Sequence, residues 1–214
     1  MGRTLSTGDG VRDSGGMASD IARVAARLFA SRGYDATSVR TIVEAAGVTK
    51  PTLYYHFGSK AGLAKALLTD PMTELVATLR GCLVEGSDPV LNLSSQVNVH
   101  FQFMRADPDR GRFFYALFFG PISSSLSMEL GRFGREISQA MMAGVVPLVD
   151  AGRIDRDRAE RFATALRGTI VVHTLDFLYP LPQCGPGLPT DDGPGLARMI
   201  VDDLIRGFGT RPTN

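Results

Sequence analysis

Apolar residues recur at intervals of three or four along most of the chain, which is the spacing that places them on one face of an α-helix. No segment alternates apolar and polar residues convincingly enough to predict a strand or a hairpin. The pattern therefore predicts an all-α fold. The expected helices cover residues 19–32, 38–46, 50–57, 60–83, 88–105, 108–120, 123–149, 155–178 and 194–208.

The most informative segment predicts a helix-turn-helix over residues 38–57, because one short helix stops and another starts within about three residues. Ser38, or the threonine before it, can cap the first helix, and Gly47 can end it. Thr49 can cap the second helix. Pro51 then falls in the first turn, where a backbone N–H would have no helical partner.

The second of these helices has an apolar side and a polar side. At about 100° per residue Leu53 and Phe57 share one side, so they are expected to anchor the helix to the core. The other side chains include a lysine, a threonine, two tyrosines and a histidine, which can bond to phosphates or to base edges. The alternative is an ordinary surface helix of mixed polarity. The adjacent tyrosines, Tyr54 and Tyr55, favour DNA binding over that alternative.

One helix before this segment and one after it complete the expected domain. Apolar residues within 21–29 keep helical spacing, so a platform helix is expected between a cap at Ser19 and a stop at Gly33. Downstream, Ser59 can cap a helix that opens with Lys60. A lysine in the first turn opposes the helix dipole, and this mismatch suggests a nearby phosphate.

Several short pieces of the segment together form a specific pattern, although each alone is a weak signal. These pieces are Ala26-Arg27-Leu28-Phe29, Gly33-Tyr34, Thr37-Ser38, Ala46-Gly47-Val48, Thr52-Leu53-Tyr54, His56-Phe57 and Ser59-Lys60. With them, residues 19 to about 68 resemble the DNA-binding domain of the TetR family of bacterial transcription regulators. The resemblance covers about a third of the chain, and beyond it the match is by architecture alone.

The resemblance implies that the second helix of the motif enters the major groove of DNA. It also implies contacts from the start of the preceding helix and from the lysine after the motif. With the capping threonines included, the predicted DNA-binding residues are Thr37, Ser38, Arg40, Thr49, Lys50, Pro51, Thr52, Tyr54, Tyr55, His56 and Lys60.

Charge is distributed unevenly along the chain. Residues 1–68 hold nine Lys or Arg and five Asp or Glu, a net charge of +4, whereas residues 69–214 hold fourteen and seventeen, a net charge of −3. A basic end suits a protein that touches a polyanion with that end. The expected organisation is a disordered tail at 1–16, a DNA-binding domain at 17–68, and a helical effector-binding and dimerisation domain at 69–214.

Cysteine usage and hydropathy indicate the cellular setting. Cys82 and Cys184 are too few for a disulfide framework, so a reduced, cytoplasmic setting is expected. A redox switch between the two cysteines stays open. No apolar run reaches eighteen residues, and the first sixteen residues lack the apolar core of a signal peptide, so neither a membrane span nor secretion is expected.

The expected second domain contains an irregularity, a pocket and an interface. Pro71 predicts a kink or break near Leu68–Pro71 in the helix that links the domains. An effector pocket is predicted between the central helices, with plain core packing as the alternative, and its apolar composition suggests a small, largely apolar effector. Its expected lining is Phe101, Met104, Phe114, Phe118, Met141, His173 and Phe177.

The last two helices are expected to form a homodimer interface, since one short recognition helix reads only a few base pairs. The residues expected to pair across it are Val171, Thr174, Leu178, Met199, Ile200 and Asp203. The alternative is that both helices pack wholly inside one subunit. His100 and His173 are the two histidines outside the DNA-binding segment. Each is expected to be a buried or surface histidine with its hydrogen bonds satisfied, and not a ligand contact.

The sequence predicts a DNA-binding transcriptional regulator, a repressor that leaves its operator when a small effector binds. One alternative is a helical ligand-binding or protein-partner module that no longer binds DNA. Another is an all-α enzyme, but the chain has no GxxxxGK[ST] loop, no HExxH pair and no GxSxG elbow. No metal-ligand spacing is present either, so neither a cofactor nor a metal is expected.

Overall fold

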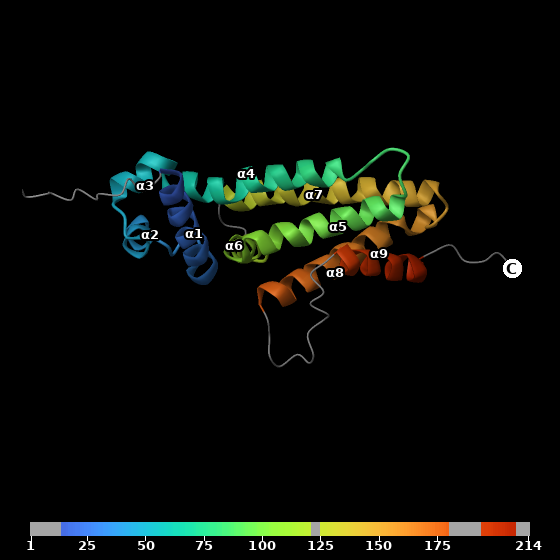
Figure 1. Cartoon of the computed structure of the whole chain (residues 1–214). Helices are drawn as coiled ribbons and strands as arrows, with labels where there is room; N and C mark the ends of the chain where they lie inside the picture. Colours follow the sequence, from blue (N-terminus) through green and yellow to red (C-terminus); the bar gives the residue numbers. More distant parts are fainter. Residues whose placement is uncertain (1–13, 121–124, 180–193, 209–214) are drawn as a thin grey trace, which may run out of the picture.

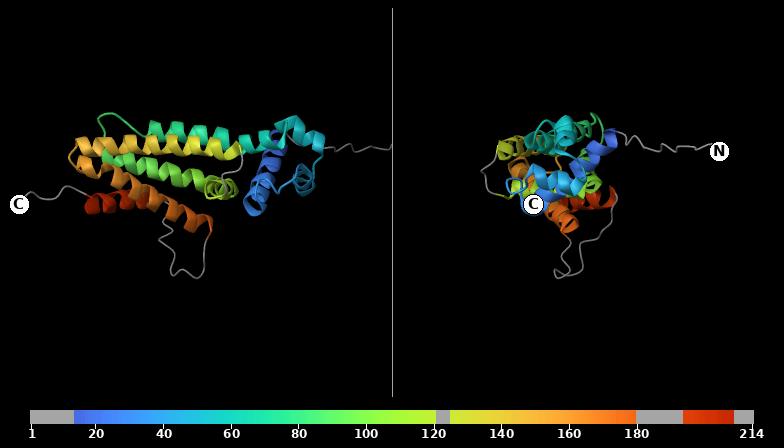
Figure 2. Two further views of the ribbon diagram at one scale, coloured as in Figure 1. Left: turned by 180° about the vertical axis from the view of Figure 1, so that it is seen from behind. Right: turned by 90° about the vertical axis from the view of Figure 1, so that its left-hand side faces the viewer.

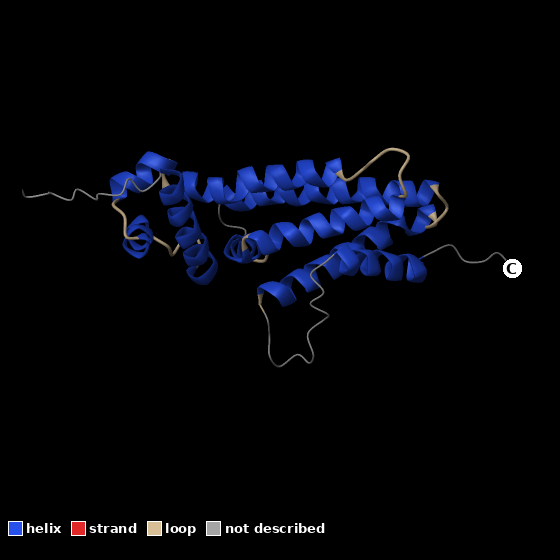
Figure 3. Cartoon of the chain, in the orientation of Figure 1, coloured by secondary structure: helices blue, strands red, loops and turns tan. Residues whose placement is uncertain are grey.

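The computed structural model describes residues 14–120, 125–179 and 194–208. Within these ranges the chain consists of helices joined by turns and loops, with no strand (Figure 3), which confirms the all-α fold. The helices are α1 (Ser14–Arg32), α2 (Val39–Ala46), α3 (Lys50–Phe57), α4 (Lys60–Gly81), α5 (Pro89–Ala106), α6 (Pro108–Phe118), α7 (Ser125–Asp150), the short 3₁₀ helix η1 (Arg156–Arg158), α8 (Ala159–Leu178) and α9 (Pro194–Phe208).

Helices α1, α2 and α3 gather at one end of an elongated molecule (Figure 1). From them α4 runs into a helical body, where α4, α5 and α7 extend along its length and α8 and α9 lie beyond α5 (Figures 1 and 2). The short helix α6 lies where the two parts meet and packs against α1. This arrangement confirms an N-terminal helix-turn-helix unit followed by a helical body.

The first helix starts earlier than its sequence pattern indicated. Helix α1 begins at Ser14, so the expected cap at Ser19 is wrong, and the helix includes the last residues of the expected tail. The side chain of Met17 packs against the apolar core, which stabilises the added turn. Residues 1–13 of the expected tail lie outside the described residues. The expected end is confirmed, since Gly33 has φ 85° and its N–H donates to the Phe29 carbonyl.

Of the expected kink or break near Pro71, the break is wrong. Helix α4 continues through this proline from Lys60 to Gly81. Leu68, Met72 and Leu75 are all buried on either side of it, so packing along the whole helix offsets the cost of one missing hydrogen bond. Similarly, Pro147 lies inside α7 and does not end it.

A single apolar core connects the two parts of the molecule. It continues from α1 through α4 and α5 to α9, and the rings of Phe29 and Phe113 meet within it at the α1–α6 contact. Cys82 is a free, half-buried thiol, whereas Cys184 and the expected loop at 180–193 lie outside the described residues. Among the helices of the described ranges, none is both long and apolar enough to cross a membrane.

Candidate DNA-binding surface

The two short helices of the motif begin with the same hydroxyl arrangement. Ser38 caps α2, and its Oγ accepts the Thr41 N–H at 3.1 Å and lies 2.8 Å from the Thr41 hydroxyl. Thr49 caps α3, where its hydroxyl lies 3.4 Å from the Thr52 nitrogen and 2.8 Å from the Thr52 hydroxyl. Both caps were expected from the sequence. They leave a pair of hydroxyls at each helix start, close to the partial positive charge of the helix dipole.

The turn between the two helices depends on Gly47. This residue adopts a left-handed conformation, with φ 65° and ψ 31°, that a residue with a side chain rarely takes. Its N–H donates to the Glu44 carbonyl, and the next N–H, from Val48, donates to the Val43 carbonyl. The chain therefore leaves α2 and enters α3 within three residues, as expected for a helix-turn-helix.

Helix α3 is held from one side and open on the other. Leu53 is fully buried and Phe57 is half-buried against the core. On the opposite side Tyr55 is 83% exposed and Tyr54 is 46% exposed. Lys50 and Pro51 are exposed as well, while Thr52 and His56 are half-buried. The outward side chains can supply a cation, hydroxyls and aromatic faces to a partner.

Neighbouring side chains restrain some of these groups. The rings of Tyr55 and His56 lie edge to face, with centroids 5.1 Å apart. On α2 the exposed Arg40 donates through Nε to Glu44 at 2.6 Å. This hydrogen bond, together with the charge of Glu44, raises the pKa of Arg40 above its ordinary value. The pair is largely exposed, so a DNA phosphate could replace the carboxylate at little cost.

Thr37 does not belong to this surface. It is completely buried, and its hydroxyl donates to the carbonyls of Gly33 at 2.8 Å and Leu28 at 3.3 Å. These bonds join the end of α1 to the segment before α2. The prediction that Thr37 contacts DNA is therefore wrong, because its only polar side-chain group is used inside the domain.

Lys60, at the start of α4, has partners within the domain. Its ammonium lies 4.3 Å from the centre of the Tyr34 ring and 3.4 Å from the Asp35 carbonyl oxygen. Desolvation lowers the pKa of Lys60, partly opposed by the charge of Asp35. Lys60 is nevertheless only half-buried, so its charge remains accessible beside the motif.

Comparison with known proteins places this segment in a family. The family model described as "Bacterial regulatory proteins, tetR family" matches residues 21–67, which contain α2, α3 and most of α1. The HTH-type transcriptional repressor KstR2 of Rhodococcus jostii is 32% identical over 98 residues, which make up 46% of this chain and 48% of that protein. The HTH-type transcriptional activator FasR of Mycolicibacterium smegmatis is 37% identical over 83 residues, 39% of this chain and 38% of that protein. The chain thus spans about half or less of the length of these relatives.

The fold likeness extends further than the sequence likeness. The structure of the ketosteroid transcriptional regulator KstR2 of Mycobacterium tuberculosis matches with a TM-score of 0.72 over 94% of this chain and 98% of that chain. Their sequence identity is 19%, so this match concerns the fold. The matched segment, residues 21–67, therefore belongs to the TetR family. The relatives named above are both described as transcriptional regulators.

The predicted pocket residues lie in different environments within the helical body. Phe101, Met104, Phe114 and Met141 are buried, and His173 is half-buried with its ring 6.1 Å from that of Phe101. These five residues are compatible with an interior apolar site.

Two other predicted pocket residues lie at the surface. Phe118 is 51% exposed because it ends α6, where its ring stacks on that of Phe114 at 6.0 Å. Phe177 is 39% exposed near the end of α8. As placed in the single chain, neither belongs to a closed interior site, which corrects the predicted lining.

Sequence analysis missed one buried polar residue in α5, Gln96. Gln96 is fully buried, and its Nε2 donates to the carbonyls of Leu79 in α4 and Ala140 in α7, both at 2.9 Å. Its Oε1 has no hydrogen-bond partner, and neither has Nε2 of His100 one turn later. The expectation that His100 is satisfied is therefore wrong for this atom. The sequence did carry a signal for this burial, because Gln96 and His100 lie four positions apart on an otherwise apolar helix face.

The last two helices present a different face from the one expected. Thr174, Leu178 and Ile200 are buried within the subunit, so they cannot reach a partner. Val172 and Met199, by contrast, are about half exposed. Three of the six expected interface residues were therefore assigned to the wrong face of their helices. A single sequence does not show which of two apolar faces the subunit itself covers.

No group of three or more His, Cys, Asp or Glu side chains within the described ranges could hold a metal ion. The polar groups that gather at the helix-turn-helix are instead hydroxyls and cations. Such groups suit the binding of phosphates and bases.

Proposed function

We propose that the chain is a transcriptional regulator that binds an operator through α3 in the major groove. The observation that carries this proposal is the orientation of α3, which buries Leu53 and turns Tyr54, Tyr55 and Lys50 outward. A helix anchored by one apolar side can enter a groove without losing its packing. The proposed contacts are those of Ser38, Arg40, Thr49, Lys50, Pro51, Thr52, Tyr54, Tyr55, His56 and Lys60.

The regulator is proposed to act as a homodimer through α8 and α9. Two-fold pairing would place two recognition helices in successive major grooves, about 34–36 Å apart. Val172 and Met199 supply exposed apolar surface on these two helices, whereas the faces that carry Leu178 and Ile200 pack inside the subunit. The oligomeric state in solution, measured by light scattering, tests this part.

The proposed effector is a small, largely apolar molecule that releases the protein from its operator. Phe101, Met104, Phe114 and Met141 are buried apolar residues of the body, and we propose that they receive it. The neighbour of known structure is named a ketosteroid regulator, which supports an apolar ligand class for this chain. Release requires that the effector bind the DNA-incompetent state more tightly than the competent one.

Repression is the proposed sign of regulation. The Rhodococcus jostii relative is named a repressor, although the Mycolicibacterium smegmatis relative is named an activator. A reporter gene placed behind the operator distinguishes the two, since deletion of a repressor raises expression and deletion of an activator lowers it.

The test of DNA binding begins with genomic fragments recovered on the purified protein, which supply the operator. Gel-shift titrations then compare Lys50→Ala and Tyr54→Ala with two controls, Lys65→Ala and Leu91→Ala, which alter exposed residues outside the proposed contact set. We expect each contact variant to weaken operator binding about tenfold, within the 1–3 kcal/mol of one good base contact, while the controls bind normally. Unchanged affinity in both contact variants contradicts the assignment.

The alternative, a ligand-binding or partner module that no longer binds DNA, makes a different prediction. Phosphate contacts make the logarithm of affinity fall with the logarithm of salt concentration, at about 0.9 per neutralised phosphate. A steep salt dependence with genomic fragments supports the regulator. Failure to retain any fragment at low salt supports the alternative.

A further inference from the structure

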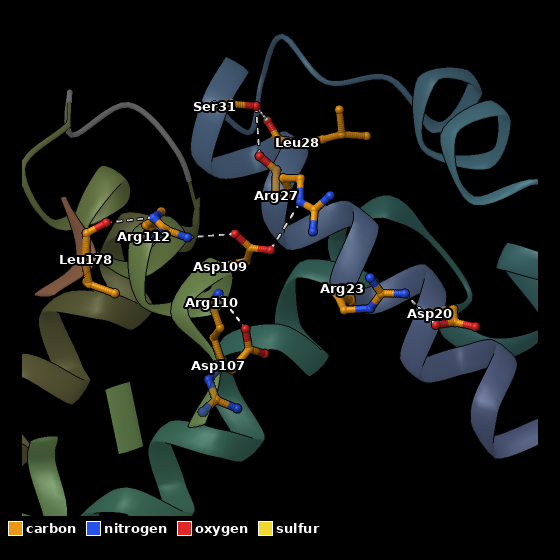
Figure 4. A network of polar contacts seen from close by, with 10 residues as sticks. All are labelled: Asp20, Arg23, Arg27, Leu28, Ser31, Asp107, Asp109, Arg110, Arg112 and Leu178. Atoms are coloured by element: carbon orange, nitrogen blue, oxygen red, sulfur yellow. Dashed lines mark hydrogen bonds and ion pairs between the residues drawn. The ribbon is translucent and has the colours of Figure 1, made fainter. Parts of the chain in front are cut away.

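A chain of polar contacts joins three helices at the junction between the DNA-binding unit and the body (Figure 4). Arg27 in α1 donates through Nε to Oδ2 of Asp109 in α6 at 3.3 Å. The other carboxylate oxygen, Oδ1, accepts from Nη1 of Arg112 at 3.0 Å. Arg112 in turn donates through Nε to the carbonyl of Leu178, the last residue of α8, at 2.9 Å. One carboxylate thus connects α1 to the end of α8.

Asp109 is well placed for this role. It lies in the first turn of α6, where the helix dipole favours a negative charge, and its side chain is only 20% exposed. Its two oxygens face two arginines, Arg27 in α1 and Arg112 in α6 itself, as Figure 4 shows. Hydrogen bonds between ionised groups are short-ranged and directional, so they fix how two helices are oriented.

The apolar contact beneath these bonds has a different effect. Phe29 of α1 and Phe113 of α6 are both fully buried, with ring centroids 4.9 Å apart. Apolar burial is strong but not directional, so this contact holds the helices together without selecting one angle. The hydrogen bond from Arg27 to Asp109, which crosses between the two helices, is directional.

The end of α8 is pressed closely against α6. A Cβ atom added to Gly111 would lie 3.1 Å and 3.3 Å from the two terminal methyl carbons of Leu178. The hydroxyl of Tyr179 also donates to the Arg112 carbonyl at 3.4 Å. A movement of the end of α8 would therefore displace α6 and, through Asp109, act on α1.

We propose that Asp109 is a positioning residue for DNA binding, which sets the orientation of the helix-turn-helix unit relative to the end of α8. The contacts of Arg27 and Arg112 with its two oxygens carry this role. The inference rests on the proposed function, in which α8 belongs to the dimer interface and the spacing of two recognition helices decides operator affinity. Neither Arg27 nor Asp109 needs to touch DNA.

The first test measures orientation without DNA. Spin labels at Ala45→Cys in α2 and Glu85→Cys beyond α4, both exposed positions, report the distance between the two parts in a Cys82→Ser, Cys184→Ser background. We expect Asp109→Asn to broaden or shift the distance distribution. Arg27→Gln should do the same, and it alters a largely exposed side chain that the fold does not need. An unchanged distribution in both variants overturns the proposal.

The matched control is Glu136→Gln, because Glu136 pairs with Arg132 within α7 and its side chain is 28% exposed, close to the value for Asp109. Its distribution should equal that of the wild type. If it broadens as much as that of Asp109→Asn, loss of any partly buried ion pair has this effect and the proposal fails.

The second test uses the recovered operator. Asp109→Asn and Arg27→Gln should each weaken binding about fivefold, in keeping with the modest strength of partly exposed ion pairs, and the double variant should be no weaker than either single one. Additive losses, or lower melting temperatures with unchanged operator affinity, contradict positioning. Should the wild type bind no DNA at all, the proposed function fails, while the distance measurement still decides the role of Asp109.

Discussion

The ammonium of Lys60 lies over the ring of Tyr34, 4.3 Å from its centre. The two residues are far apart in sequence, one after α1 and the other at the start of α4. The contact explains how a lysine is tolerated in the first turn of a helix, where the dipole disfavours it, because the ring and the Asp35 carbonyl offset that cost. It also holds the charge beside the motif in a fixed position.

The role of Lys60 can be separated from that contact by salt dependence. If its ammonium meets a phosphate, Lys60→Gln should reduce the slope of log affinity against log salt by about 0.9. Tyr34→Leu removes the ring but keeps the cation, so its slope should match the wild type. Gel shifts at several salt concentrations measure both. An unaltered slope in Lys60→Gln, with a lower melting temperature, would make Lys60 purely structural.

Pro71 gives a prediction about stability. Because α4 stays helical through Pro71, the missing N–H and the ring's crowding of the preceding turn are costs that the folded state carries. We expect Pro71→Ala to raise the free energy of unfolding by about 1–3 kcal/mol, measured by urea denaturation. The control is Pro89→Ala in the first turn of α5, where proline costs nothing, and it should not stabilise. A Pro71→Ala protein no more stable than the wild type would show that the helix is not strained there.

Local features of this fold could be predicted from the sequence. The caps at Ser38, Thr49 and Ser59 and the left-handed Gly47 all act through residues at most four positions away. The anchor Leu53 follows from helical spacing alone. For this reason the helix-turn-helix and its outward face could be predicted from a single sequence.

Features that depend on distant partners could not be predicted in the same way. Thr37 has a residue type and a place suited to a cap, and only its bonds to the carbonyls of Leu28 and Gly33 show that it is buried. The roles of Asp109 and Gln96 likewise depend on hydrogen bonds to helices that are distant in the sequence. Which face of α8 the subunit covers is also decided by packing, and not by the pattern of apolar residues.

Gln96 and Gly144 form a close pair whose fit can be tested. A Cβ atom on Gly144 would overlap Oε1 of Gln96, so Gly144→Ala should lower the free energy of unfolding by about 1–3 kcal/mol. Gln96→Ala should also destabilise, because it leaves the Leu79 and Ala140 carbonyls without this donor. The double variant should lose less than the sum of the two, since truncation of Gln96 makes room for the new methyl.

A control and a contrary result complete this test. Gly16→Ala in α1 meets no atom within 4 Å, so it should be neutral or slightly stabilising. Thermal and urea unfolding of all four variants give the coupling energy. Strict additivity of the two substitutions would mean that α5 and α7 move apart easily, and that Gln96 does not join them rigidly.

His100 makes stability depend on pH in a defined direction. Burial lowers the pKa of His100 from 6.5 to about 4, so between these values the unfolded chain binds a proton that the folded chain does not. The free energy of unfolding should therefore fall as the pH drops from about 6.5 towards 4, by about 3 kcal/mol for a shift of this size.

His100→Phe fills a similar volume, does not titrate and removes the unpartnered Nε2. At pH 7 this variant should be at least as stable as the wild type. Its advantage should grow by about 3 kcal/mol at pH 4, while the carboxylates shared by both proteins cancel in the difference. Parallel urea denaturation of both proteins from pH 7 to pH 4 measures this, and a constant difference across the range would show that His100 is open to solvent.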